Sequence, residues 1–105
     1  MELVDLLRGL NIRAGYGRFE KPMELPYAVY LGAGQERFFG DNTIYSKKND
    51  YTIEYYFRSK DSTAEERLES KLLEEGYIYE KSEDVYIDTE KLFVIYYTVW
   101  RKQYE

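Results

Sequence analysis

The sequence has 105 residues, 44% of them hydrophobic and 18% aromatic, and a formal net charge of −5. It is too apolar for a disordered chain, and its length suits one domain, residues 1–105, with a single core. It holds neither cysteine nor histidine, so disulfides, thiolate metal sites and histidine-based catalysis are excluded. We therefore expect no enzyme, no cofactor and no metal.

The charge is unevenly distributed along the chain. Residues 1–60 carry nine Lys/Arg and eight Asp/Glu, a net +1, whereas residues 61–105 carry six against twelve, a net −6. No basic cluster of the kind that binds phosphates is present, so we expect no direct affinity for nucleic acid. No apolar run approaches the ~20 residues that span a bilayer, and the first residues lack signal-peptide features, which predicts cytoplasmic synthesis without membrane association.

The N-terminal region is predicted to be a helix followed by an irregular segment. Residues 1–11 read as a short helix because Leu3, Leu7 and Leu10 recur at helical spacing. Residues 12–25 hold two glycines and a proline without a clear period, so we expect a loop, an arm or an irregular strand pair there.

Residues 26–58 are predicted to form strands. A first strand over residues 26–31 is expected to end at the glycines of residues 32–34, and residues 42–47 supply a hairpin partner before a turn at residues 48–50. The two glycines match the start of a dinucleotide-binding loop, but Arg37 occupies the position of its third glycine, so we interpret this segment as an ordinary loop.

The strand from Tyr51 to Arg58 has aromatic residues on both faces. Alternate side chains of a strand point to opposite sides of the sheet. One set is free of charge and is predicted to face the core, while the other mixes rings with charges. The two sets are Tyr51, Ile53, Tyr55 and Phe57, and Thr52, Glu54, Tyr56 and Arg58.

The helix predicted for residues 62–75 has the clearest local signals. Ser62 and Glu65 have the spacing of a capping box, and Gly76 stands where a helix-ending glycine belongs. The carboxylates outside the apolar stripe are interpreted as a solvated surface and not as a catalytic pair. The stripe is Ala64, Leu68, Leu72 and Leu73; the carboxylates are Glu65, Glu66, Glu69, Glu74 and Glu75.

Residues 77–100 are predicted to return to strands, over residues 77–80, 85–88 and 92–100. The last strand is apolar on both faces, which is typical of a central strand or one covered twice. Together these elements predict an α+β fold, with an antiparallel or mixed β-sheet of four to five strands and two helices packed on one face.

Two groups of residues are candidates for a protein interface. Tyr56, Tyr96 and Trp100 share the second face of the sheet, where a tyrosine ring can be covered by a partner while its hydroxyl stays wet. The other group lies in the predicted loop, where the rings either anchor the loop under the sheet or form a docking arm. This group is Arg37, Phe38, Phe39 and Asp41.

Several short motifs follow one another in an order that points to a family. They are Pro26-Tyr27-Ala28-Val29-Tyr30, Phe39-x-Asp41-Asn42, Tyr51-x-Ile53-Glu54-Tyr55-Tyr56, Lys60-Asp61, Tyr79-Glu80-Lys81 and Glu90-x-Leu92. With this series the chain, from about residue 25 to residue 100, resembles the small head–tail connector or tail-completion (tail terminator-like) proteins of tailed phages and prophages of Gram-positive bacteria.

The resemblance implies a virion structural protein that forms an oligomeric ring, commonly a hexamer, between the tail tube and the head connector. Its partners would be copies of itself and those two proteins, and DNA would pass through without specific binding. An acidic wall suits such passage, so we expect part of the acidic C-terminal half to face the lumen or an assembly partner. The protein would reside in the host cytoplasm during assembly and then in the virion at the head–tail junction.

Two alternatives stay open at this point. Within the family, the chain could be a tail terminator, which we favour, or a head-closure protein. Outside it, the same exposed rings would suit a stand-alone protein- or peptide-binding module encoded by a prophage.

Overall fold

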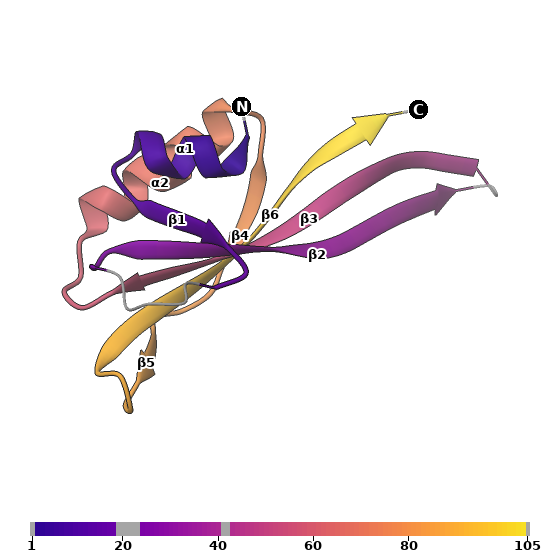
Figure 1. The fold of residues 1–105 in the computed structure, drawn as a ribbon. Coiled ribbons are helices and arrows are strands. Elements are labelled where there is room, and N and C mark those ends of the chain that lie inside the picture. Colours follow the sequence, from indigo (N-terminus) through magenta and orange to yellow (C-terminus); the bar gives the residue numbers. More distant parts are fainter. Residues whose placement is uncertain (1, 19–23, 41–42, 105) are drawn as a thin grey trace.

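The computed structural model describes residues 2–18, 24–40 and 43–104 and has an α+β fold, as predicted (Figure 1). The described residues form the two helices expected and six strands, where four to five strands were expected. The elements are α1 Leu3–Gly9, β1 Arg13–Tyr16, β2 Tyr27–Gly40, β3 Thr43–Phe57, α2 Ser62–Glu74, β4 Ile78–Lys81, β5 Val85–Ile87 and β6 Leu92–Tyr104.

The strands form one mixed sheet in the order β1-β2-β3-β6-β4, with β5 also beside β6. Only β1 and β2 are parallel, while the remaining pairs are antiparallel. Strand β6 has β3 along one edge and β4 and β5 along the other, so of the two alternatives predicted, a central strand or one covered twice, the central position is confirmed. Both helices lie on the same face of the sheet (Figure 1).

Strand β1 lies within residues 12–25, where we expected a loop, an arm or an irregular strand pair. It pairs with the start of β2, from Arg13 beside Tyr27 to Tyr16 beside Tyr30. Four residues with a glycine among them are too few to show a period, and their partner strand follows later in the chain, so the sequence pattern missed them.

Residues 32–40 of the predicted loop and residues 48–50 of the predicted turn are also strand. Strands β2 and β3 pair from Tyr27–Tyr56 out to Gly40–Thr43. The register shifts between Gly32 and Gly34, where an extra residue is accommodated in the manner of a bulge. Glycine inside a strand often marks such a bulge, and here the sequence pattern mistook it for a strand end.

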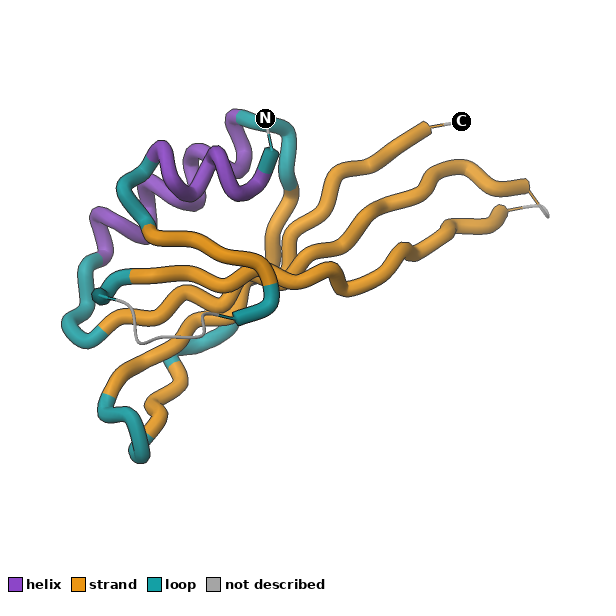
Figure 2. The backbone as a smooth tube through the Cα atoms, viewed as in Figure 1, coloured by secondary structure: helices purple, strands orange, loops and turns teal. Residues whose placement is uncertain are grey.

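These long strands form an arm that continues beyond the helices (Figure 2). We define the arm as residues 31–40 of β2, 43–50 of β3 and 101–104 of β6. It gives the chain its elongated shape, with principal extents of 49 × 26 × 25 Å. Within the described part of the chain, no helix lies over either face of the arm (Figure 1).

The core lies between the helices and the sheet. Its sheet side is the face predicted from alternation, with Ile53, Tyr55 and Phe57 of β3 buried. Residues of α1 and α2 cover this face, and the same side of β6 completes it. The helical members are Leu3, Leu6, Leu7, Leu68 and Leu72; those of β6 are Ile95, Tyr97 and Val99.

The ends of α2 explain its length and correct one prediction. The N-cap is Asp61 and not Ser62, because the Asp61 carboxylate accepts a hydrogen bond from the backbone N–H of Ala64 at 3.1 Å. The predicted helix-ending glycine is confirmed, since Gly76 has φ +87°. Tyr77 N–H donates to Leu72 O at 2.9 Å, which closes a Schellman motif.

Candidate interaction surface

The sheet face opposite the helices carries an aromatic surface that we call the open face. We define it by residues that the strand register places on that face. They are Tyr27 and Leu31 of β2, Glu54 and Tyr56 of β3, Ile78 of β4, and Tyr96 and Trp100 of β6. In the described part of the chain no helix lies over these residues.

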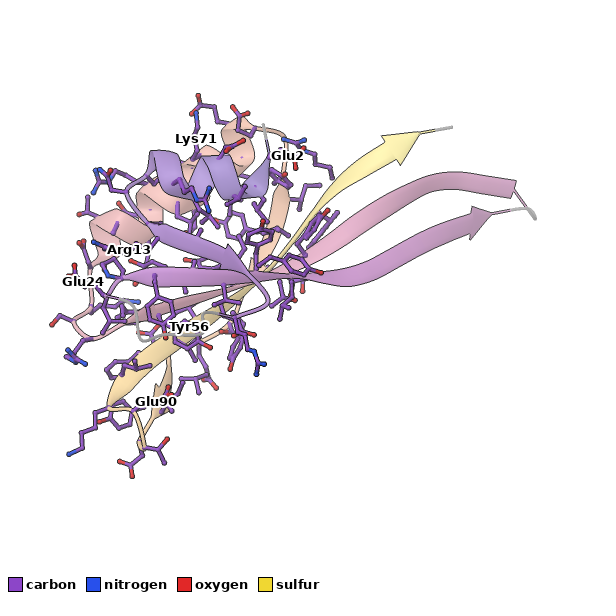
Figure 3. All side chains as sticks on the ribbon, in the orientation of Figure 1. Glu2, Arg13, Glu24, Tyr56, Lys71 and Glu90 are labelled. Atoms are coloured by element: carbon purple, nitrogen blue, oxygen red, sulfur yellow. The ribbon has the colours of Figure 1, made fainter. Side chains whose placement is uncertain are left out.

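Tyr56 is held in place by its own subunit. Its ring stacks on Tyr27 with centroids 4.8 Å apart, and its hydroxyl donates to the Glu54 carboxylate at 2.6 Å. Burial, together with that hydrogen bond, raises the pKa of the Tyr56 hydroxyl well above its ordinary value, so it stays protonated at neutral pH. Figure 3 shows Tyr56 on the side of the sheet away from the helices.

Tyr96 and Ile78 are the most exposed hydrophobic residues of the open face, with 38% and 41% of their surface accessible to solvent. Trp100, beside Ile78 in the register, is half-buried. The backbone of Tyr96 is fixed, because its N–H donates to Ser82 Oγ and its carbonyl accepts from Ser82 N–H, both at 2.9 Å. A rigid backbone thus presents an apolar patch to solvent, at little entropic cost for binding.

Some side chains on the same side of the sheet as the open face are buried. Val29, Leu92 and Val94 lie on this side of the sheet and are buried within the subunit, outside the main core cluster. The accessible part is therefore the stretch around Tyr96, Ile78 and Trp100. Sequence reasoning missed Ile78, although alternation against the buried Tyr77 would have placed it on this face.

The second predicted group lies on the arm. Arg37, Phe38 and Phe39 are part of β2, where the register sets them beside Lys47, Ser46 and Ile44 of β3. The structure describes only the backbone of these residues, so the choice between an anchoring ring and a docking ring remains a prediction. Asp41 lies outside the described residues.

A buried charge cluster between α2 and the sheet was not predicted. Glu65, expected in a solvated surface, is 2% exposed. Lys60 Nζ lies 2.8 Å and Lys81 Nζ 3.0 Å from its carboxylate. Lys81 also lies 2.8 Å from Glu69, which accepts a 2.8 Å hydrogen bond from the Tyr97 hydroxyl. We call these five residues the charge cluster.

The spacing of α2 explains the charge cluster. Glu65, Leu68, Glu69 and Leu72 follow one another at helical intervals, so all four point towards the sheet. Leu73, which we had placed in the apolar stripe, is instead 57% exposed. The helical spacing of Glu65 and Glu69 with the two leucines could be read from the sequence. We interpreted both carboxylates as solvated because carboxylates on a helix usually are.

The charge cluster has a stabilising role, because its charged groups are paired with one another. Burial opposes the ionised form of Glu69, but hydrogen bonds from Lys81 and Tyr97 outweigh it and hold the pKa of Glu69 below its ordinary value. Burial likewise opposes the ammonium of Lys81, while Glu69 and Glu65 raise the pKa of Lys81. Both groups are therefore charged and mutually paired at neutral pH, and neither is poised to exchange protons.

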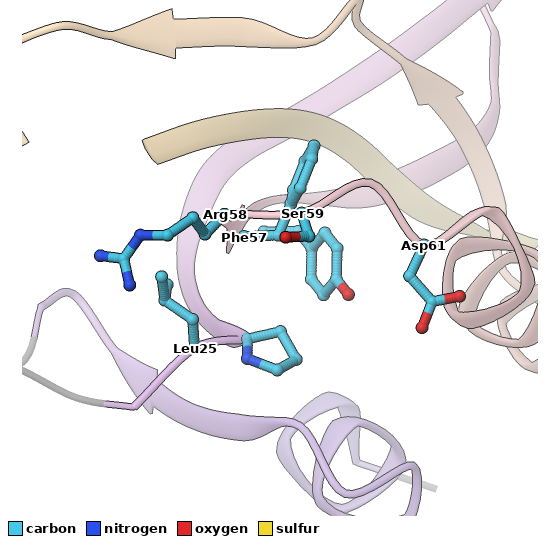
Figure 4. Close-up of a pocket in the computed structure, with 7 residues that line it drawn as sticks. Leu25, Phe57, Arg58, Ser59 and Asp61 are labelled. Atoms are coloured by element: carbon cyan, nitrogen blue, oxygen red, sulfur yellow. The ribbon is translucent and has the colours of Figure 1, made fainter. Parts of the chain in front are cut away.

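A shallow hollow lies where the start of β2 meets the start of α2 (Figure 4). It has a volume of about 310 Å³ and is lined by Leu25, Pro26, Tyr55, Phe57, Arg58, Ser59 and Asp61. A neighbouring hollow of about 200 Å³ shares Pro26, Tyr55 and Asp61. The lining is mainly apolar, with the exposed Arg58 as its cation.

No protein-family model matches the chain, and no curated protein matches its sequence. None of the helices described is both long and apolar enough to cross a membrane. Among the described residues, no three acidic side chains gather in a way that could hold a metal ion.

Proposed function

We propose that this protein is a structural connector of a tailed phage or prophage virion. It would form a ring at the head–tail junction, between the tail tube and the head connector, in the role of a tail terminator. It would act there by binding other protein subunits and would carry out no reaction. DNA would pass through the ring without specific contacts.

The observation that carries this proposal is the open face. An apolar face of a sheet is normally covered by a second layer of helices or strands. Here the helices cover one face only, and Tyr96 and Ile78 remain exposed on the other. Exposed aromatic residues on a rigid scaffold are enriched at the centres of protein interfaces. The resemblance of the sequence motifs to those of tail-completion proteins, together with the long arm, supports the same proposal.

The proposal is tested by measuring the mass of the protein by light scattering at several concentrations, with and without purified phage tail-tube protein. We expect assembly, on its own or on addition of the tube protein. Tyr96→Ala removes an exposed ring from the open face, and a contact of this kind contributes about 1–2 kcal/mol, which weakens assembly about 5- to 30-fold. A protein that stays monomeric with the tube protein and with the head-connector protein would contradict the proposal.

A matched control is available on the other side of the sheet. Tyr86 is also exposed, at 51%, and the register sets it beside Phe93 on the helix-facing side. Tyr86→Ala removes the same ring but leaves the open face intact, so assembly should equal that of the parent protein. Equal weakening by both substitutions would mean that the open face has no special role.

A peptide-binding module is the second candidate, and the hollow beside α2 is the observation that favours it. The hydroxyl of Tyr55, which lines both hollows, has no hydrogen-bond partner among the described residues. Arg58 at the rim would suit an acidic peptide with an apolar side chain. If the protein were a monomer that bound such peptides, and if Arg58→Ala abolished the binding, a peptide-binding function would be favoured over the connector.

A further inference from the structure

The open face carries the proposed connector function, which leaves the two hollows beside α2 without a role. The hollows adjoin one another, because Pro26, Tyr55 and Asp61 line both of them. We call the two together the paired hollow. Ligand pockets in proteins usually have volumes of about 300–1,000 Å³. The parts of the paired hollow, at about 310 Å³ and 200 Å³, therefore have room for one or two side chains of a ligand.

Tyr55 brings a hydroxyl without a partner to the paired hollow. The residue is only 2% exposed, and its hydroxyl makes no hydrogen bond among the described residues. The buried Tyr97, in contrast, donates to Glu69 at 2.8 Å. A buried hydroxyl without a hydrogen bond is costly and uncommon in native structures. Burial raises the pKa of the Tyr55 hydroxyl, so it is protonated at neutral pH and can donate to a ligand oxygen.

The walls of the paired hollow are largely apolar. Leu25 and Pro26, which precede β2, and Phe57 at the end of β3 line the larger part. Leu10 and Ile12, which follow α1, line the smaller part. Leu25, Pro26 and Leu10 each keep part of their surface accessible to solvent. An apolar side chain placed in the paired hollow would cover this surface, which is favourable in water.

Each part of the paired hollow also has one arginine that is not paired. Arg58 lines the larger part and Arg67 the smaller, and both are exposed without an ion pair among the described residues. Figure 4 shows Arg58 and Asp61 at opposite ends of the larger part. The Asp61 carboxylate already accepts from Ala64 N–H at the start of α2, where the helix dipole offsets its charge. The paired hollow therefore favours anionic groups, although the whole chain has a net charge of −5.

We propose that the paired hollow binds a short, extended, acidic segment of another protein, in which carboxylates flank an apolar side chain. The apolar side chain would lie against Pro26, the carboxylates would meet Arg58 and Arg67, and a ligand oxygen would accept from the Tyr55 hydroxyl. A shallow site with a cation in each part suits an extended chain better than a small molecule, which is usually enclosed on most sides.

This site goes beyond the connector function, because none of its residues belongs to the open face. It would give the assembled connector a second, independent contact, whereas the peptide-binding module considered above would replace the connector. The exposed charges would make the contact weaker as the salt concentration rises.

Fluorescence anisotropy of a labelled peptide tests the site. The probe is a dye-labelled peptide of seven residues, with leucine at the centre, two aspartates on each side of it and a glycine at each end. We expect binding that weakens with salt and is lost when lysines replace the aspartates. Glycine in place of the central leucine should weaken binding about 5- to 10-fold, because a shallow hollow buries only part of the side chain.

Substitutions of arginine locate the charge that the peptide meets. Arg58→Ala and Arg67→Ala should each weaken binding about two- to fivefold, as expected for exposed ion pairs. Arg18→Ala is the matched control, since Arg18 is also exposed but lines neither part of the paired hollow. It changes the net charge of the protein by the same amount and should leave binding unchanged.

Tyr55→Phe separates a role in binding from a role in the fold. It removes only the hydroxyl, which has no partner in the described protein, so the melting temperature should stay the same or rise. Peptide binding should weaken about 2- to 10-fold, as expected for one hydrogen bond. Tyr97→Phe removes a hydroxyl that is bonded to Glu69, so it should lower the melting temperature and leave binding unchanged. Unchanged binding by Tyr55→Phe would contradict the proposed site.

Two further outcomes would overturn the site: no binding of the aspartate peptide at millimolar concentration, and equal weakening by Arg18→Ala and Arg58→Ala, which would indicate attraction by overall charge alone. Light scattering on the same samples separates this result from the connector function. Assembly without peptide binding would remove the site and leave the connector. Peptide binding by a chain that stays monomeric with both virion partners would keep the site and contradict the connector.

Discussion

Glu65 is the most deeply buried charged residue in the described part of the chain. Its carboxylate is paired with Lys60 and Lys81, which are themselves partly exposed. Breaking a fully buried pair costs about 3–5 kcal/mol, but lysines that reach water lose less, so we expect Glu65→Ala to lower the free energy of unfolding by about 1–3 kcal/mol. Denaturation by urea measures the change.

Glu66→Ala is the control for that substitution, since Glu66 is the exposed neighbour on the same helix. Surface substitutions of this kind usually change stability by less than about 0.5 kcal/mol. If the two variants were equally stable, the charge cluster would contribute nothing to the fold, and its role would have to be sought elsewhere.

Glu69 makes the stability depend on pH in acid. A carboxyl whose pKa is lowered by folding stabilises the native state above its unfolded pKa, here about 4.5, and this contribution is lost as the pH falls through the lower native value. We therefore expect Glu69→Gln to be less stable than the parent at pH 7, with the gap closing below about pH 4.5. Denaturation curves from pH 3 to pH 7 measure it, and a gap independent of pH would contradict the assignment.

At the scale of elements, the end of α2 depends on the backbone of Gly76. Its φ of +87° is strained for any residue with a Cβ, although a Cβ there would meet no other atom within 4 Å. We expect Gly76→Ala to cost about 1–2 kcal/mol from backbone strain alone. Gly9 has the same open surroundings without the positive φ, so Gly9→Ala should be neutral or stabilising by thermal denaturation. Equal effects at both sites would exclude the backbone explanation.

The elements also show how far the sequence alone can lead. Helix α2, its glycine end and the core face of β3 were predicted, because each depends on local spacing or alternation. Strand β1 and the arm were not, since their pairing is decided by residues far along the chain, and glycines at a bulge resemble strand ends. Alternation correctly placed Tyr56, Tyr96 and Trp100 on one face. It did not predict that Tyr56 is partly buried, because that burial depends on contacts with Tyr27 and Glu54.

At the scale of the whole molecule, the chain is a one-sided structure. The helices cover one face of the sheet, the open face remains accessible around Tyr96, and the arm extends beyond both layers (Figures 1 and 2). A stable isolated domain would be expected to shield such surfaces. This shape supports our proposal that the protein is one part of a larger assembly, with the open face as a contact surface.

Trp100 gives the most direct test, because it is the only tryptophan in the chain and lies on the open face. Acrylamide quenching of its fluorescence is measured across the concentration range in which the protein assembles, alone or with tail-tube protein. We predict that quenching falls and the emission shifts to the blue as assembly proceeds, because a second protein covers the ring. Assembly that grows in mass while the quenching of Trp100 stays unchanged would contradict the claim that the open face is the interface.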